Sequence, residues 1–154
     1  MSLGGEEGHP LVEEAVQYAE SKGVLLVAAA GNDGPDEGSI DYPGAYPGVV
    51  VVGAINEGRE VVVWSSRGVN NNDGLIGALE VEFAAPGVNV LSTYKDGCYA
   101  LMSGTSMAAP HVSGQAARLW QGSGQATRAF LQSIAQNLST PGEDSATGLG
   151  LPVQ

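Results

Sequence analysis

Cysteine, basic residues and long hydrophobic runs are all scarce in this 154-residue sequence. Its single cysteine, Cys98, excludes an internal disulfide, and the absence of any Cys/His cluster gives no signal for a zinc or redox site. We expect Cys98 to be buried or half-buried. No apolar run approaches the roughly 20 residues that span a bilayer, and no basic segment followed by an apolar one opens the chain. The sequence therefore predicts no membrane partner and contains no visible signal peptide.

Positive charge is the scarcest feature: six Lys or Arg face 17 Asp or Glu, for a formal net charge of −11. Such a chain repels phosphate backbones, which argues against a nucleic-acid partner. Nine of the acids lie in the first 41 residues, where Lys22 is the only base. Cationic partners or metal ions are favoured there, although a solvated acidic face is the commoner explanation of such clustering.

The apolar residues follow an α/β pattern. Residues 11–22 carry their apolar side chains at the helical period, with Pro10 at the start and Gly23 at the end. The run Val24–Ala30 is continuously apolar, which is typical of a parallel strand buried on both faces. It ends in the polar turn Gly31–Pro35, at the carboxyl end of a strand, where open α/β sheets place their chemistry.

Further elements follow along the chain. Strands are predicted at residues 49–55, 61–64, 81–85 and 88–94, helices at 103–120 and 125–137, and a loose tail at 142–154. We find no internal repeat or low-complexity segment.

Ser106 lies in the segment Gly104–His111, GTSMAAPH, at an expected helix start. Such a position exposes a hydroxyl and aims main-chain N–H groups at an oxyanion. From the residues alone, a Gly-Thr-Ser turn is more often a simple helix N-cap. A Gly-x-Ser-x-Gly elbow, which would indicate an α/β hydrolase, is not what surrounds Ser106.

Three segments resemble the subtilase family of serine proteases: Gly104–Gly114 (GTSMAAPHVSG), Val27–Pro35 (VAAAGNDGP) and Met1–Gly5 (MSLGG). Shorter matches are Tyr42–Pro47, Phe83–Gly87 and Gly148–Gly150, so the resemblance covers essentially the whole chain. It implies the C-terminal half of a subtilisin-type catalytic domain over residues 1–154, an incomplete three-layer, doubly wound, mostly parallel α/β sheet.

The resemblance also implies roles for individual residues. Ser106 matches the catalytic nucleophile, which forms an acyl-enzyme, and its main-chain N–H would be one oxyanion donor. Asn32 matches the side-chain amide that supplies the other. Ser2, Leu3 and Gly4 resemble the edge that binds an extended substrate, and Ala29, Ala30 and Gly31 resemble the opposite pocket wall; without the resemblance, these would be strand core and a frayed terminus.

Asp41 falls near the floor of that pocket in the family, where a carboxylate could favour Lys or Arg in substrates. A surface Asp that opens the turn before Tyr42-Pro43-Gly44 is the alternative we prefer from the sequence.

No cofactor is expected for the chemistry, but some subtilases hold a structural cation at positions matching Gly44, Tyr46, Val49, Glu80 and Glu82. Two carboxylates, three carbonyls and water would satisfy calcium, and a solvated acidic face is equally compatible.

The general base and its orienting carboxylate have no counterpart in the sequence, which contains neither an Asp-Ser/Thr-Gly nor a His-Gly-Thr-His pattern. His9 lies outside any catalytic motif and His111 is more than one helical turn beyond Ser106, so neither is expected to act as the base.

Activity of the chain alone is therefore not expected. We expect a truncated protease, one chain of a two-chain protease or, as the alternative function, a noncatalytic peptide-binding or assembly module, in that order. Peptide or protein substrates, a complementary N-terminal half or self-association are the expected partners, since a half-sheet leaves strand edges unpaired. The resemblance further implies a secreted protein.

Overall fold

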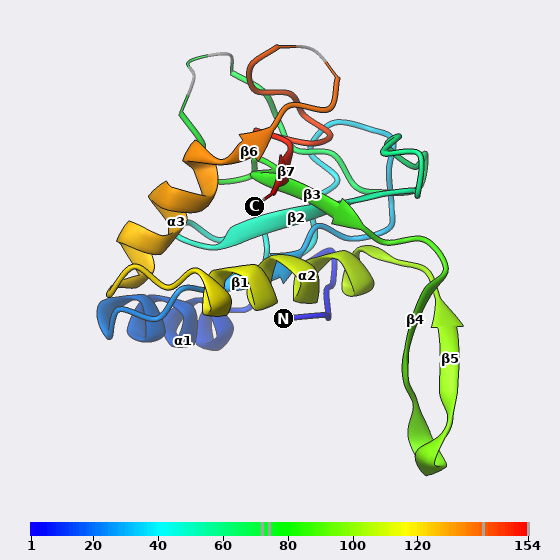
Figure 1. Cartoon of the computed structure of the whole chain (residues 1–154). Coiled ribbons are helices and arrows are strands. Elements are labelled where there is room, and N and C mark those ends of the chain that lie inside the picture. Colours follow the sequence, from blue (N-terminus) through cyan, green and yellow to red (C-terminus); the bar gives the residue numbers. More distant parts are fainter. Residues whose placement is uncertain (72, 74, 140, 154) are drawn as a thin grey trace.

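A three-stranded parallel sheet forms the centre of the molecule, seen in a computed structural model that describes residues 1–71, 73, 75–139 and 141–153 (Figure 1). Its strands are β1 (Val27–Ala29), β2 (Val50–Ile55) and β3 (Phe83–Pro86), in the order β1-β2-β3. Val27 pairs with Val50 and Val52 with Phe83. β1 and β2 are buried along their whole length, as their continuous apolar sequences predict.

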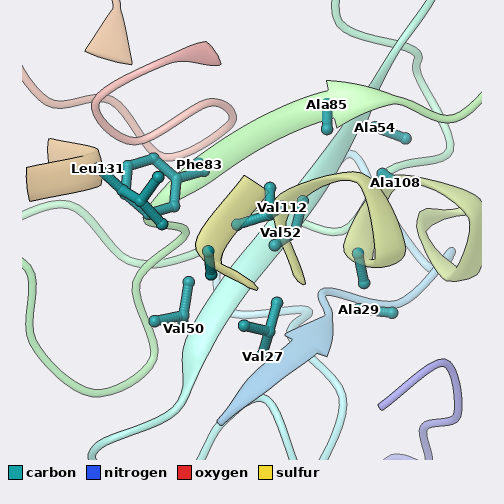
Figure 2. Close-up of a cluster of buried hydrophobic side chains, with 12 residues drawn as sticks. Val27, Ala29, Val50, Val52, Ala54, Phe83, Ala85, Ala108, Val112 and Leu131 are labelled. Carbon is teal, nitrogen blue, oxygen red and sulfur yellow. The ribbon is translucent and has the colours of Figure 1, made fainter. Parts of the chain in front are cut away.

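Helices cover both faces of this sheet. On one face, α2 (Thr105–Arg118) and α3 (Gly124–Ser133) pack against alternate strand residues, including Val27, Val52 and Phe83 (Figure 2). On the other face, α1 (Pro10–Ser21) inserts Val16 beside Ala28 and Val49. The arrangement confirms the predicted three-layer α/β architecture. In the described part of the chain, no helix combines the length and apolar character needed to cross a membrane.

A β-hairpin extends away from this body (Figure 1). β4 (Val90–Thr93) pairs antiparallel with β5 (Tyr99–Met102), and the short 3-10 helix η1 (Lys95–Gly97) lies between them. The sequence predicted the first strand but not the second. Cys98 follows η1 at the tip of the hairpin and is exposed, so the expected burial of this cysteine is wrong.

Two other sequence predictions are corrected by the structure. Residues 61–64 form no strand but a turn, which folds back on β2 through a single bridge between Ile55 and Val61. The predicted loose tail is ordered instead: β7 (Leu151–Pro152) pairs with β6 (Ala135–Gln136), and Leu149 N–H donates to Glu82 O. Gln154, the last residue of that predicted tail, lies outside the described residues.

Candidate active site

Ser106 is the second residue of α2, where a main-chain N–H has no carbonyl partner within the helix. Gly104 caps the helix with φ 155°, a conformation that side-chain-bearing residues rarely adopt. The Ser106 side chain is half-buried and its hydroxyl donates to Ser2 O at 3.4 Å. The helix start therefore holds an accessible hydroxyl next to an unpaired N–H donor.

The Ser106 carbonyl is bonded from outside the helix. Pro110 lies four residues further along α2 and has no N–H to donate to Ser106 O. Instead, the Ser2 hydroxyl donates to Ser106 O at 2.8 Å. Ser2 and Ser106 are thus joined twice, which attaches the N-terminal segment to the start of α2.

Asn32 is held beside Ser106 by the intervening residue, Thr105. The Thr105 N–H donates to Asn32 Oδ1 at 3.0 Å, and Thr105 Oγ1 lies 3.2 Å from the same oxygen. Thr105 Oγ1 also accepts from Gly31 N at 3.1 Å. Because the amide oxygen is bonded to Thr105, the Nδ2 group of the exposed Asn32 is its free donor end.

The predicted substrate edge, Ser2–Gly4, is exposed and lies beside β1. Ala29 N–H donates to Met1 O at 3.0 Å, and the Met1 amino group donates to Val27 O, so the first residue continues the sheet edge. Ser2, Leu3 and Gly4 then lead away from β1 past the start of α2. An extended chain could pair with this edge, as strands do in β-augmentation.

The three residues of the predicted opposite wall are all buried. Ala29 packs in the core below α2 and Ala30 is fully buried, with its N–H and C=O bonded to Val52 and Asp41. Their side chains cannot contact a peptide in this arrangement, because the sheet and its covering layers enclose them. Gly31, which follows β1 with φ 109°, is buried as well, and its N–H donates to Thr105 Oγ1 at 3.1 Å.

The Asp41 side chain lies between Gly4 and Gly31. A β-carbon on Gly4 would lie 2.6 Å from Asp41 Oδ2, and one on Gly31 would lie 2.8 Å from the same oxygen. The carboxylate therefore contacts both segments through their bare α-carbons. Burial, followed by the nearby charges of Asp33 and Glu6, raises the pKa of Asp41 above its ordinary value.

Glu82, one of the five residues predicted to bind calcium, has a cationic partner within the chain, and the calcium site itself stays a prediction. Arg128 binds Glu82 through Nε to Oε1 at 2.9 Å and through Nη2 to Oε2 at 2.8 Å, and its Nη1 approaches Gly48 O at 3.4 Å. Gln132 adds a bond to Glu82 Oε1 at 2.7 Å. The Arg128 guanidinium therefore offsets the negative charge of Glu82.

Glu80 points elsewhere. It is buried, Gly77 N–H donates to one of its oxygens, and the other, Oε1, has no donor N–H among the described residues. Glu143 lies close enough to Glu80 for the two carboxyl groups to interact, and in the described part of the chain no N–H group donates to its oxygens. Burial, then the charge of Glu80 and, after it, that of Asp73, raises the pKa of Glu143. Sequence patterns did not indicate this pair, because 63 residues separate its members. In the described ranges, no three His, Cys, Asp or Glu side chains are grouped to hold a metal ion.

Neither histidine is bonded to Ser106 in the residues that the structure describes. His9 caps α1, where its Nδ1 accepts from Leu11 N at 3.2 Å, and His111 Nδ1 lies 2.8 Å from Met107 O on α2. Both rings thus make local contacts at helices, and the expectation that neither is the general base stays a prediction.

Comparison with known proteins gives consistent results. The profile of the subtilase family, Peptidase_S8, matches residues 1–150. Subtilisin of Bacillus sp. (strain TA39) is 48% identical over 127 residues, which cover 78% of this chain and 30% of that protein. The minor extracellular protease Epr of Bacillus subtilis (strain 168) is 40% identical over 155 residues, or 98% of this chain and 22% of Epr.

Among solved structures, the S41 psychrophilic protease matches 99% of this chain with a TM-score of 0.94 and 42% identity. The match covers 55% of that structure. The chain thus spans about half, or less, of the length of these relatives.

Proposed function

Since the chain belongs to the subtilase family of serine proteases, we propose that it carries the nucleophile and oxyanion-binding part of a serine endopeptidase site. The observation that carries this proposal is the bracing of Asn32 by Thr105. Because Thr105 binds the Asn32 amide oxygen, Asn32 Nδ2 and the main-chain N–H of Ser106 both lie next to Thr105. Neither donor has a partner among the described residues. Two such donors can stabilise the oxyanion that develops when a hydroxyl attacks a peptide carbonyl.

In the proposed reaction, Ser106 Oγ attacks the carbonyl carbon while a general base removes its proton. The base returns that proton to the leaving amine as the C–N bond breaks, and water then hydrolyses the acyl-Ser106 ester by the same route. Within the described residues no histidine contacts Ser106, so we infer that a polypeptide bearing the Asp and His supplies the base. Without it, Ser106 is a weak nucleophile near neutral pH.

The substrate in this proposal is an extended peptide. Ser2–Gly4 would pair with its main chain, and Gly31 and Asp41 would border the side chain that precedes the cut. Because Epr is named as an extracellular protease, we also propose that the complete enzyme acts outside the cell.

Labelling with a fluorophosphonate serine probe tests the proposal. We expect no labelling of the chain alone and labelling at Ser106 after co-expression with an Asp- and His-bearing subtilase half, detected by intact mass. The Ser106→Ala variant is the matched control and should stay unlabelled in both states. Labelling of the chain alone would contradict the inferred external base, and no labelling of the folded complex would contradict the protease proposal.

A second candidate is a noncatalytic module that binds peptides. It is favoured by one observation: the Ser106 hydroxyl is bonded to Ser2 O rather than to a base. Measurable peptide affinity without labelling in the complex would support this candidate.

A further inference from the structure

The segment Ser2–Gly4 is fixed at both of its ends by main-chain hydrogen bonds. On one side, Met1 continues the edge of β1, because Ala29 N–H donates to Met1 O at 3.0 Å. On the other side, Gly5 N–H donates to Tyr42 O at 3.0 Å, and Tyr42 N–H donates back to Gly5 O at 2.9 Å. The short connection between these two anchors therefore keeps its position independently of its own side chains.

Ser2 is the residue of this connection that is bonded to α2. Its hydroxyl donates to Ser106 O at 2.8 Å, and the Ser106 hydroxyl donates back to Ser2 O at 3.4 Å. The shorter of the two bonds is made to the carbonyl that faces Pro110, a residue without an N–H. A hydroxyl from a fixed segment thus takes the place of a missing main-chain donor in the first turn of the helix.

The main chain of Ser106 has no place in the regular hydrogen-bond pattern of α2. Its N–H lies in the first turn, where no helical carbonyl precedes it, and its C=O is four residues before Pro110. The same N–H is one of the two proposed oxyanion donors, so it has to stay unpaired and yet remain in place. A bond to the C=O of the same residue restrains its backbone without occupying the N–H. The Ser2 hydroxyl makes such a bond.

We propose that Ser2 is a positioning residue for the nucleophile, and that it acts through its hydroxyl on the Ser106 carbonyl. The bond holds the hydroxyl and the N–H of Ser106 in constant positions relative to Asn32, which Thr105 fixes separately. Groups that are held in the reactive geometry react faster, and small displacements from it cost rate. The inference rests on the proposed function, because it concerns how the same serine is held for attack.

The kinetics of labelling by the fluorophosphonate probe test the inference in the complex with an Asp- and His-bearing subtilase half. In this reaction Ser106 Oγ displaces fluoride from phosphorus and its proton passes to the base. Labelling at several probe concentrations separates the rate of this covalent step from the affinity for the probe. We expect Ser2→Ala to slow the covalent step about tenfold and to leave the affinity unchanged, because one positioning hydrogen bond is lost.

Two further variants show whether the lost bond is the cause. In a Pro110→Ala background the helix itself can supply the donor to Ser106 O, so Ser2→Ala should there leave the covalent rate unchanged. Ser21→Ala is the matched control, since the Ser21 hydroxyl also donates to a helix carbonyl, Tyr18 O at 2.6 Å, but on α1. It should alter neither the rate nor the affinity. Thermal melts of the complexes show that each variant is folded at the labelling temperature.

The outcomes separate this inference from the proposed function. An unchanged covalent rate in Ser2→Ala would overturn the inference while leaving the protease chemistry intact, and a purely structural role for Ser2 would give that result together with a lower melting temperature. An equal loss of rate in the Pro110→Ala background would also overturn it. If the unsubstituted complex is not labelled at all, the proposed function fails, and the inference fails with it.

Discussion

At the scale of single residues, the helix that carries Ser106 depends on bonds that its own sequence cannot supply. Pro110 leaves Ser106 O without its helical donor, and the Ser2 hydroxyl replaces that donor from the far end of the chain. Thr105 performs a similar task for Asn32. Resemblance to a family could identify Ser106 and Asn32, but these supporting contacts depend on tertiary structure and became visible only in three dimensions.

The link between Ser2 and Pro110 can be measured by a double-mutant cycle. Ser2→Ala should lower the free energy of unfolding by about 1 kcal/mol, because it removes the bond to Ser106 O. In a Pro110→Ala background, the N–H of Ala at this position can donate to Ser106 O. Ser2→Ala should then leave the free energy of unfolding almost unchanged. Denaturant unfolding of the four proteins gives the coupling energy. Equal costs in the two backgrounds would show that Pro110 does not create the need for Ser2.

At the scale of elements, Glu80 and Glu143 bring two acidic side chains together where the segment before β3 meets the segment before β7. For a carboxyl group whose folded pKa is raised, the folded state holds its proton more tightly than the unfolded state. Stability is then greatest below the ordinary value of 4.5 and falls as the pH rises through that value toward the folded pKa. At neutral pH the charge of Glu143 is destabilising.

Replacing this charge should therefore stabilise the chain in a pH-dependent way. We expect Glu143→Gln to raise the melting temperature at pH 7 by no more than roughly 2 °C, because Glu143 is only partly buried and solvent screens its charge. Little change is expected at pH 4, where the carboxyl group of the unsubstituted chain is protonated. Glu57→Gln, at an exposed position, is the matched control.

Calcium binding between Glu80 and Glu143 would also offset the charge of Glu143 and raise the melting temperature. Of the two carboxylates predicted to bind a cation, Glu80 is the one that is not bonded to Arg128. Calcium should then raise the melting temperature of the unsubstituted chain more than that of Glu143→Gln. An equal response of both proteins would argue against a cation between the two carboxylates.

The elements also show where sequence patterns succeed. β1 and β2 were predictable because strands buried on both faces require continuous apolar residues. The segment before β7 was not, since its order comes from polar contacts: Asp144 accepts from Thr147 Oγ1 at 2.6 Å and from Ala146 N at 2.8 Å. Gly148 lies so close to the residues just before β3 that a β-carbon on it would be 2.2 Å from Val81 O. Hydrophobic periodicity carries no information about such contacts.

At the scale of the whole molecule, two apolar surfaces have no covering element among the described residues. The hairpin exposes Leu91, Tyr99 and Leu101, each with 65% or more of its surface accessible. A groove lined by Leu25, Val27, Ala116 and Trp120 follows the edge of β1. Exposed apolar surface and an open strand edge together favour association with another chain.

We therefore expect the isolated chain to self-associate, with the hairpin as a principal contact. Its sedimentation coefficient should rise with concentration, and Leu91→Ser combined with Leu101→Ser should weaken the association at least about tenfold, since each leucine would lose its burial in the contact. Leu11→Ser, an exposed leucine on α1, should have no such effect. Because both hairpin leucines are exposed, the double variant should unfold at the same temperature as the parent. A monomer at all concentrations would show that these surfaces do not bind a second copy, and an Asp- and His-bearing half would then be the partner to test on them.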